Sequence, residues 1–387
     1  MHICHITIDH TPYDDRIYYR ELWSLIGWAD RITLVAKDEL EPDLAYPEIE
    51  IVNFPRVKVL KRLPYIREIV TDLQPDIIHL HEPELLLLLP YLRRKTDAAI
   101  IYDMHEPLAE VIREFSRAPR WKRYLLSFIL GTGERSVLSY LDGVIHTSLP
   151  LYTSLHTANP NSTIIYNFPR LDIFEPREHT EPEEFTILYQ GQIAPARGIL
   201  ELLEAFYHFY RREQHGHLRI IGYIHPVEFE ETIRQAIKYY SISHAVTLEK
   251  EIQHSKMPEV LANSSVGVMA LLPSRAFQKS VQGKTFEYMA TGLPAIAGNY
   301  ASAYQFIGNT QSGIVLEDSD PHTISAALST LANNPDRRKK MSHNAQQAVR
   351  KQFRWDRMGE RLRDFYVQVL NNKRGRLSRI RWRNLSV

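Results

Sequence analysis

Cysteine is nearly absent from this sequence: Cys4 is the single one among 387 residues. One cysteine forms no disulfide framework and supplies no cysteine-based metal site. We therefore expect a reducing, cytoplasmic compartment. The chain begins MHICHITI, without a basic segment and a cleavable hydrophobic segment, so the sequence predicts no secretory signal.

Long hydrophobic runs are also missing. Hydrophobic residues make up 44% of the chain and charged residues 24%, which is typical of globular proteins. The longest apolar stretches, such as residues 85–89 and 124–130, are far shorter than the roughly 18 to 20 residues that cross a bilayer. We expect a folded chain without a transmembrane segment.

The chain lacks a strong excess of either charge, since its net charge is +1. The body of the protein therefore has no basic excess for binding nucleic acid. The tail, residues 373–387, is the exception, because it contains six cations and no acid: Lys373, Arg374, Arg376, Arg379, Arg381 and Arg383. At about 1 kcal/mol per cation, this tail, with the basic and aromatic residues 117–124, predicts peripheral attachment to an anionic membrane on its inner face. A disordered, solvated tail is the alternative.

The chain is long enough for two domains of the usual size, roughly 100 to 200 residues each. Short apolar runs alternate with helical patterns. We predict strands at residues 2–8, 31–36, 49–54, 76–81, 98–105 and 143–148, and again at 185–191, 218–223, 246–249, 266–272, 294–298 and 314–317. Continuous apolar strands such as AIIYDM are typical of parallel sheets that are covered on both faces. The pattern predicts an α/β fold with two Rossmann-like, doubly wound domains.

The predicted boundaries follow from composition. Residues 1–167 form the first domain, and residues 168–184, rich in Pro, Glu and Arg, form a linker. Residues 185–352 form the second domain. The helical pattern of residues 335–370 breaks at 353–355, so residues 353–372 are predicted as a C-terminal helix that precedes the tail.

No glycine-rich turn follows the first strand, where an NAD-binding domain would carry GxGxxG. The loop instead reads Asp9-His10-Thr11-Pro12-Tyr13-Asp14-Asp15-Arg16. Strand ends bind ligands in doubly wound sheets, so Asp14, Asp15 and Arg16 are candidates for holding a sugar or an acceptor. The alternative is a solvated loop in which Asp14 or Asp15 caps the next helix.

Histidines and acids follow two further strands, in His79-Leu80-His81-Glu82 and Asp103-Met104-His105-Glu106. The two-residue spacing puts His79 and His81 on the same face of a strand without fixing further ligands. We therefore expect no metal site. His81 is a candidate on the acceptor side, although a histidine at a strand end is more often a hydrogen-bonded structural group.

Two segments of the second half carry the chemistry of phosphate binding. One runs from Gly191 and Gln192 through Arg197 to a helix that we predict near Ile199. A glycine turn, a helix N-terminus and an arginine suit a diphosphate, although a surface arginine beside a turn is the alternative. In the other, a predicted helix over residues 284–290 puts Lys284 and Glu287 one turn apart. They suit a phosphate and ribose hydroxyls; a surface ion pair is the alternative.

The run KTFEYMATGLPAIA, residues 284–297, resembles the (K)(L)FEYMAxGxPVIA signature of glycosyltransferase family 4. Further segments resemble that family in the same order: DDRIYYRELWSL, PDIIHLHEPELL, IIYDMHE, LYQGQIAPARGILELLEAF and FRWDRMGERLRDFYVQVL. The resemblance implies a GT-B fold, with an interdomain cleft, a nucleotide-sugar bound mainly to the second domain and a glycan, lipid-linked or small-molecule acceptor bound mainly to the first. It also implies a hexosyltransferase that retains anomeric configuration and uses no cofactor or metal.

The resemblance assigns roles to individual residues. It implies that Arg197 and Lys284 hold the diphosphate, that Glu287 holds the ribose and that Gly191 lets the donor approach. His105 would lie beside the donor sugar. The base is expected near residues 249–252, including Glu251 and Ile252, and the sugar near residues 275–281.

The sequence departs from the family at two positions. Lys279 stands where many members have a second carboxylate, and Gln192 stands where a basic residue is common. The first departure puts the sugar contacts in question, and the second leaves Arg197 and Lys284 to neutralise the diphosphate. Two alternatives therefore stay open: a sugar-nucleotide 2-epimerase of the same architecture, and a catalytically silent subunit that binds a nucleotide-sugar or glycan.

Overall fold

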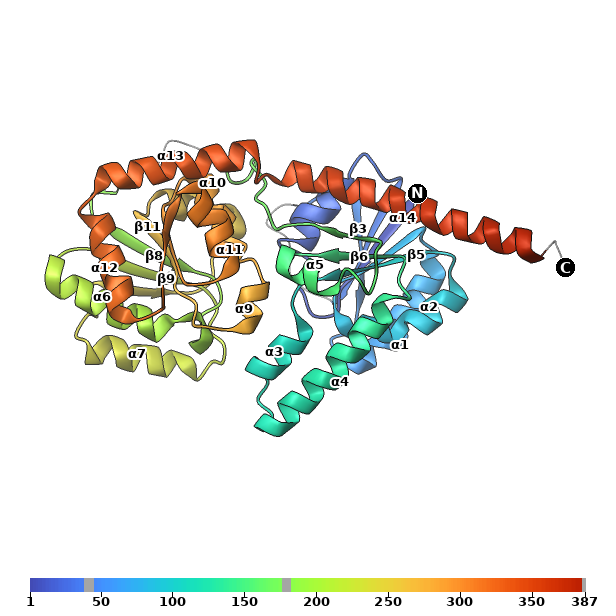
Figure 1. The fold of residues 1–387 in the computed structure, drawn as a ribbon, viewed down its shortest axis with the longest axis horizontal. Helices are drawn as coiled ribbons and strands as arrows, with labels where there is room; N and C mark the ends of the chain where they lie inside the picture. The colour runs from blue at the N-terminus through green and yellow to red at the C-terminus, as the bar shows by residue number, and fades with distance from the viewer. Residues whose placement is uncertain (38–44, 176–181, 385–387) are drawn as a thin grey trace. The chain divides into compact units, whose positions relative to one another are not determined.

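The computed structural model describes residues 1–37, 45–175 and 182–384. It divides into two compact units (Figure 1). Unit 1 comprises Met1–Asn167 and Asp356–Val387, and unit 2 comprises Phe168–Trp355. The residues that we predicted as a linker, 168–184, thus fall at the start of unit 2, with 176–181 outside the described residues. No helix within the described ranges is both long and apolar enough to cross a membrane.

The described part of unit 1 is built on a seven-stranded parallel sheet of order β3-β2-β1-β4-β5-β6-β7. Its strands are β1 (His2–Ile6), β2 (Arg31–Lys37), β3 (Ile49–Phe54), β4 (Ile77–Leu80), β5 (Ala99–Met104), β6 (Gly143–His146) and β7 (Ser162–Ile164). Every residue of β4, β5 and β6 is buried. Burial of whole strands is what their continuous apolar sequences predict.

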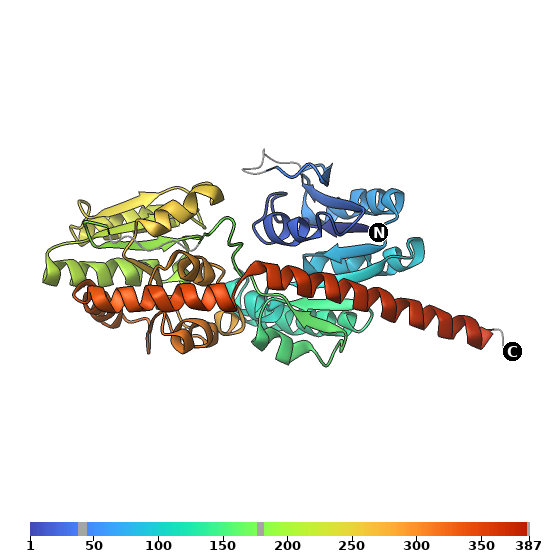
Figure 2. The same cartoon turned by 90° about the horizontal axis from the view of Figure 1, so that it is seen from above.

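The helices of unit 1 cover this sheet. They are α1 (Val59–Leu73), α2 (Leu89–Lys95), α3 (Leu108–Phe115), α4 (Arg120–Leu138) and α5 (Leu149–Leu155), with 3-10 helices at Trp23–Leu25 and Pro83–Leu88 and a π-helix, η1 (Ile17–Leu22). The last helix, α14 (Trp355–Asn384), runs along unit 1 in both ribbon views (Figures 1 and 2). The chain therefore leaves unit 1 after Asn167 and returns to it for its final helix.

The described part of unit 2 has a six-stranded parallel sheet of order β10-β9-β8-β11-β12-β13. Its strands are β8 (Thr186–Gln190), β9 (His217–Ile221), β10 (Val246–Glu249), β11 (Val266–Met269), β12 (Ala295–Ala297) and β13 (Gly313–Val315). Its helices are α6 (Ile199–Glu213), α7 (Phe229–Tyr239), α8 (Met257–Ala262), α9 (Arg275–Lys279), α10 (Lys284–Thr291), α11 (Ala301–Ala303), α12 (Pro321–Ala332) and α13 (Pro335–Lys351), with short turns at Pro195–Arg197 (η4), His254–Lys256 and Tyr304–Gly308.

The structure confirms the prediction of two doubly wound α/β domains, and each predicted strand range overlaps an observed strand. In each sheet the strand order reverses beside the first strand, between β1 and β4 and between β8 and β11. Ligands bind outside the carboxyl ends of strands at such a switch point. The loops that follow β1, β4, β8 and β11 are therefore the places to look for a site.

Candidate functional site

In unit 2, the turn that follows β8 depends on glycines. Gly191 has a φ of +106° and Gly198, just before α6, has a φ of +72°. A Cβ on Gly198 would lie 2.0 Å from the carbonyl oxygen of Ala270, and one on Gly222 would lie 1.8 Å from that of Gly191. Residues with side chains rarely adopt these φ values, and two of these positions have no space for a Cβ. The backbone is thus packed closely at the carboxyl end of the central strands.

Lys284, the first residue of α10, reaches this turn. Its ammonium donates a hydrogen bond to the carbonyl oxygen of Gln190 over 2.6 Å and lies 4.2 Å from the ring centre of Tyr189. Burial lowers the pKa of Lys284 to about 7; the charge of Arg197 lowers it further, whereas Glu287 opposes the shift. An anion beside this ammonium would stabilise its charged form. Lys284 is therefore well placed to gain from binding a phosphate.

Glu287 lies one helical turn further along α10, as the sequence predicted. It is only 9% exposed, and its Oε2 accepts a hydrogen bond from the side-chain amide of Gln190. The burial of Glu287 excludes the alternative of an ion pair on a helix surface. Because Lys284 contacts the backbone of Gln190 and Glu287 contacts its side chain, the end of β8 and the start of α10 are held together by one residue.

Arg197 ends the short helix η4 (Pro195–Arg197) beside the same turn. Its guanidinium donates to Oε1 of Gln282 over 2.7 Å and to Oε1 of Gln192 over 3.3 Å, and it lies 4.9 Å from the ring centre of Phe277. These partners are all uncharged. Among the residues that the structure describes, no carboxylate forms an ion pair with Arg197, so its positive charge is available to an anion.

Lys279, Glu251 and Ile252 are the remaining donor-side residues of the sequence analysis. Lys279 is the last residue of α9 and is half-buried. Glu251 is exposed and Ile252 is half-buried, both just after β10. Glu249, at the end of that strand, forms a two-pronged ion pair with Arg219, with distances of 2.9 and 3.1 Å. The structure therefore brings Gly191, Gln192, Arg197, Lys284 and Glu287 together, whereas Glu251 and Ile252 belong to a separate loop.

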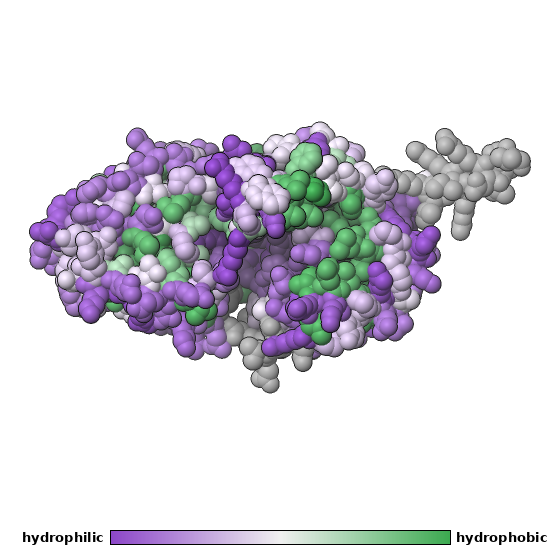
Figure 3. Space-filling model, turned by 90° about the horizontal axis from the view of Figure 1, so that it is seen from below, coloured by the Kyte–Doolittle hydropathy of each residue, from purple (hydrophilic) through white to green (hydrophobic). Residues whose placement is uncertain are grey.

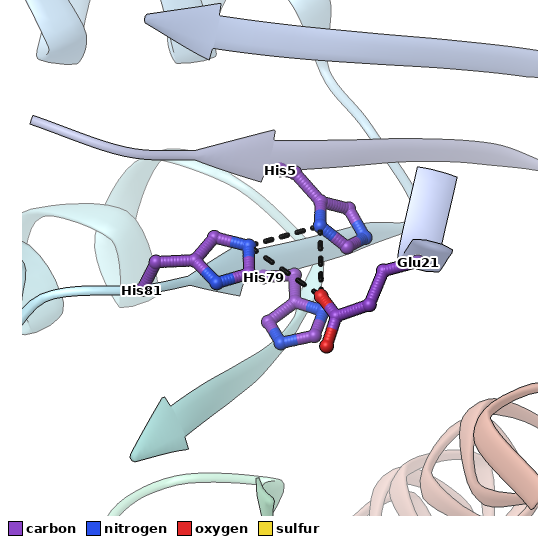
Figure 4. Close-up of side chains that lie close together, drawn as sticks. All are labelled: His5, Glu21, His79 and His81. Atoms are coloured by element: carbon purple, nitrogen blue, oxygen red, sulfur yellow. Dashed lines mark hydrogen bonds and ion pairs between the residues drawn. The ribbon is translucent and has the colours of Figure 1, made fainter. Parts of the chain in front are cut away.

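In unit 1, hydrogen bonds connect four histidines and a tyrosine. His105 Nε2 lies 3.1 Å from His81 Nδ1, and His81 Nε2 lies 2.9 Å from His5 Nδ1. The Tyr366 hydroxyl of α14 lies 2.9 Å from His5 Nε2 and 2.7 Å from His79 Nδ1. Figure 4 shows His5, His79 and His81 together with Glu21, from three neighbouring segments of unit 1. We call the five hydrogen-bonded residues, His105, His81, His5, Tyr366 and His79, the histidine chain.

The direction of the bonds in the histidine chain follows from Asp103. Its carboxylate lies 3.2 Å from His105 Nε2 and can only accept, so that nitrogen carries the proton. Burial lowers the pKa of His5, His79 and His81, so each of these rings is neutral and carries one proton. The protons then point in sequence from His105 to His81, to His5, to Tyr366 and to His79. The side chain of His105, at the start of the histidine chain, is 17% exposed.

Arg16 pairs with two buried acidic side chains of this region, Asp103 and Glu21. Its guanidinium donates to both oxygens of Asp103, at 2.7 and 3.0 Å, and lies 3.1 Å from Glu21. Although burial opposes ionisation of Asp103, Arg16 and then His105 hold its pKa well below the usual range. Burial raises the pKa of Glu21 well above its usual value, although Arg16 opposes that shift. Asp103 is therefore the charged partner of Arg16.

Two of the predicted acceptor-side residues are not placed as we expected. Arg16 is 4% exposed and its guanidinium is taken up by Asp103, the carbonyl of Ile165 and Asn167. His81 is 2% exposed and both of its ring nitrogens lie in the histidine chain. Buried polar groups need such partners. Both residues are therefore structural here, as the alternative for His81 proposed.

Asp14 and Asp15 stay near the surface, with side chains 23% and 38% exposed. Asp14 Oδ1 accepts from the backbone N–H groups of Arg16 and Ile17 at the start of η1, and Oδ2 lies 3.1 Å from His10 Nδ1. Asp15 pairs with Arg20. Asp14 thus caps the following helix, which was the alternative to a sugar contact.

Two groups of side chains in unit 1 have the composition of a metal site. His5, Glu21, His79 and His81 have potential ligand atoms within 4.8 Å of one another, as do His81, Asp103 and His105. The 2.9 Å contact between His5 and His81 is a hydrogen bond that needs a proton on one nitrogen, whereas a metal needs the lone pairs of both. Hydrogen bonding accounts for the clustered nitrogens, and the absence of a metal stays a prediction.

Sequence reasoning missed His5, Glu21, Gln190 and Tyr366. His5 and Gln190 lie inside strands that were interpreted only as apolar, and Tyr366 is 361 residues from the histidine that it contacts. The one available signal was a polar side chain in the middle of a buried strand, because such a group needs a partner.

The family model of glycosyl transferases group 1 matches residues 172–348, which covers nearly all of unit 2. Unit 2 is thus the part of the chain that resembles glycosyl transferases group 1. Lys284, Glu287, Arg197 and Gly191 all lie within the matched range. The glycine-bounded turn and the pair on α10 therefore lie in the segment that resembles this family.

Relatives by sequence are similar to about half of this chain. A GDP-mannose-dependent alpha-(1-6)-phosphatidylinositol monomannoside mannosyltransferase of Mycobacterium tuberculosis is 25% identical over 186 residues, 47% of this chain and 47% of the relative. The capsular polysaccharide biosynthesis glycosyltransferase CapM of Staphylococcus aureus is 23% identical over 194 residues, 50% of this chain and 49% of CapM. The match thus spans about half the length of these relatives, and both are named as transferases.

Solved structures resemble the whole chain in fold. A sucrose-phosphate synthase from Thermosynechococcus elongatus has a TM-score of 0.79 at 18% identity, covering 96% of this chain and 99% of its own. HepE from Anabaena, in complex with UDP-glucose, has a TM-score of 0.74 at 12% identity, covering 95% and 100%. The fold is thus GT-B, with one Rossmann-like domain in each unit. The epimerase alternative gains no support from these relatives.

Proposed function

We propose that this protein is a retaining glycosyltransferase that moves a sugar from a nucleotide-sugar to a glycan, lipid-linked or small-molecule acceptor. The observation that carries the proposal is the cluster at the end of β8 in unit 2. There, Lys284 and Arg197 present two cations, and Glu287 presents a buried carboxylate within a few residues of a tight glycine turn.

The chemistry assigned to these residues is electrostatic. Negative charge develops on the departing diphosphate during sugar transfer, and fixed positive groups stabilise that charge without reorganising. Arg197 offers a planar fork for phosphate oxygens, and Lys284 offers a point charge. Glu287 accepts from ribose hydroxyls. Attack from the leaving-group side, with the phosphate taking the acceptor's proton, needs no protein nucleophile.

We propose no cofactor or metal for this reaction, because two side-chain cations serve the diphosphate. The donor base stays open. The mycobacterial relative is named as GDP-mannose-dependent and the HepE structure contains UDP-glucose, so purine and pyrimidine donors both belong in a test.

We further propose a cytoplasmic location and contact of residues 373–387 with anionic lipid on the inner face of the membrane. The six cations of the tail support this contact. Residues 373–384 belong to the end of α14. Lys373 itself donates to the backbone carbonyl of Asp97 over 2.6 Å.

The test begins with a thermal-shift screen of UDP, GDP and ADP sugars, since a ligand at about 100 times its Kd adds about 2.7 kcal/mol of stability. Release of free nucleotide is then measured with and without acceptor extracts, each with and without EDTA. Acceptor-dependent release that EDTA leaves unchanged is expected. Binding without release would instead identify a silent subunit, with Lys279 in place of the second carboxylate as the expected cause. Conversion of the sugar without acceptor would identify an epimerase.

A further inference from the structure

Helix α4 exposes an unusual amount of apolar surface. Besides Tyr124, six large apolar side chains of this helix are between 41% and 70% exposed: Trp121, Leu125, Leu126, Phe128, Ile129 and Leu130. We call these six residues the α4 patch. Figure 3 shows hydrophobic residues gathered on the face of unit 1 that carries α3 and α4. Contiguous exposed apolar surface of this kind marks an interaction site in a folded protein.

The exposure follows from how α4 packs. Its side facing α3 carries small residues: Ser127 Oγ donates to the carbonyl of Ala109 over 2.7 Å, and a Cβ on Gly131 would lie 2.9 Å from that of Ala109. Within α4, only Ser127, Glu134 and Leu138 are buried. A surface helix normally turns its large apolar side chains inward. Over residues 121–131 of α4, the small residues Ser127 and Gly131 face α3 and the large apolar residues face outward.

Cations flank the α4 patch. Residues 117–133 contain Arg117, Arg120, Lys122 and Arg123 and no acid. The guanidinium of Arg120 lies 5.9 Å from the ring centre of Tyr124, and the ammonium of Lys122 lies 5.4 Å from that of Trp121. Cations and aromatic rings beside exposed leucine and phenylalanine are the composition of a helix that lies in the plane of an anionic membrane surface.

We propose that the α4 patch docks unit 1 on an anionic lipid bilayer, with the apolar side chains entering the interface and the cations contacting headgroup phosphates. A second copy of this chain fits less well, because a two-fold contact would bring the same four cations of both copies together. This inference concerns a surface of unit 1 and goes beyond the proposed function. It would bring the enzyme to an acceptor that is carried in the membrane.

The experiment is cosedimentation of the full chain with vesicles of phosphatidylglycerol and phosphatidylcholine, and with vesicles of phosphatidylcholine alone. The patch variant is Leu125→Glu with Phe128→Glu, at positions that are 50% and 70% exposed. The matched control is Val227→Glu with Tyr239→Glu in unit 2, at positions that are 74% and 82% exposed, which adds the same charge and removes two exposed apolar groups. Circular dichroism and thermal melting check that each variant is folded.

We expect the wild type and the control to bind the anionic vesicles alike, and the patch variant to partition at least ~10-fold more weakly. Leu125→Ser with Phe128→Ser, which adds no charge, should also lose binding, because insertion is lost. A variant that lacks residues 376–387 distinguishes binding through the α4 patch from binding through the basic tail. Transfer is not needed for vesicle binding, so a failed assay for the proposed function leaves this result intact.

Three outcomes would overturn the proposal. The patch variant could bind vesicles like the wild type. Binding could depend entirely on residues 376–387, which would assign it to the tail. The wild type could form a dimer in light scattering that the patch variant dissolves, which would make the α4 patch an interface between copies.

Discussion

The ammonium of Lys284 lies 2.6 Å from the carbonyl oxygen of Gln190, at the point where β8 ends and the glycine turn begins. This contact fixes the position of the cation before any anion is bound. Pre-positioned charge is effective in catalysis because it is not reorganised during the reaction.

Replacing Lys284 with Ala should lower kcat/KM for the nucleotide-sugar by ~10- to 150-fold. The variant loses a charged hydrogen bond worth about 1.5 to 3 kcal/mol to the departing diphosphate. Lys340→Ala, at an exposed position of α13, is the matched control and should leave kcat/KM unchanged. Wild-type kinetics from a folded Lys284→Ala protein would reject the role of this lysine.

The affinity for the donor should fall as pH rises above 7. The pKa of Lys284 in the free protein is about 7, and a bound diphosphate raises it, so donor binding at higher pH requires the uptake of a proton. The Kd should then rise by up to ~10-fold per pH unit above pH 7 and change little below it. Calorimetry in buffers of different ionisation enthalpy measures both the Kd and the proton uptake. In Lys284→Met the dependence should vanish, and its persistence would assign it to another group.

Glu287→Gln should weaken binding of a nucleoside diphosphate by ~10- to 150-fold, because ribose hydroxyls lose a charged acceptor. The same nucleotide with a 2′,3′-dideoxyribose has no hydroxyls to lose. It should bind the wild type and the variant with similar Kd values. A loss of equal size for both nucleotides would show that Glu287 supports the turn through Gln190 rather than the ribose.

Arg16→Met should destabilise the protein by about 3 to 5 kcal/mol, because it leaves the charge of Asp103 buried without its partner. Arg31→Met is the control, since Arg31 and Glu50 form an ion pair whose side chains are 48% and 47% exposed. Such a surface pair contributes about 0 to 1 kcal/mol. Urea unfolding measures both values. Equal losses of stability in the two variants would mean that other groups compensate the charge of Asp103.

Tyr366→Phe should cost about 1 to 3 kcal/mol of stability, because ring nitrogens of His5 and His79 lose their hydrogen-bond partner. Tyr239→Phe, at a position that is 82% exposed, should change stability little. Thermal and urea unfolding give the comparison. In nitrogen NMR of histidine-labelled protein, the wild type should show His105 protonated at Nε2, and the opposite tautomer would refute the direction of the histidine chain.

Local patterns predicted much of this structure. The apolar strands were visible because each is a short continuous run, and α10 was visible because Lys284, Glu287 and Gly292 mark one turn and a helix end. Gly292 indeed has a φ of +73° at the end of α10. Sequence spacing was sufficient where the interacting residues are near one another in the chain.

Long-range packing was not predictable in this way. The sequence suggested that Arg16 faces an acceptor, but a carboxylate 87 residues away takes up its guanidinium. The outward face of α4 was also hidden, because periodicity alone does not say which side of a helix meets its neighbour. The contacts of Ser127 and Gly131 with Ala109 show that these small residues face inward.

The place of Tyr366 in the chain affects how the protein is made. The sheet of unit 1 is synthesised first, yet the hydroxyl that joins His5 to His79 comes after the whole of unit 2, residues 168–355. At roughly 5 to 20 residues per second, the ribosome needs about 10 to 40 seconds to add that segment. Throughout this interval the nascent unit 1 has two inward-facing imidazoles whose partner has not yet been translated. Unit 1 is therefore the part that a chaperone would meet in an unfinished state, although it emerges first.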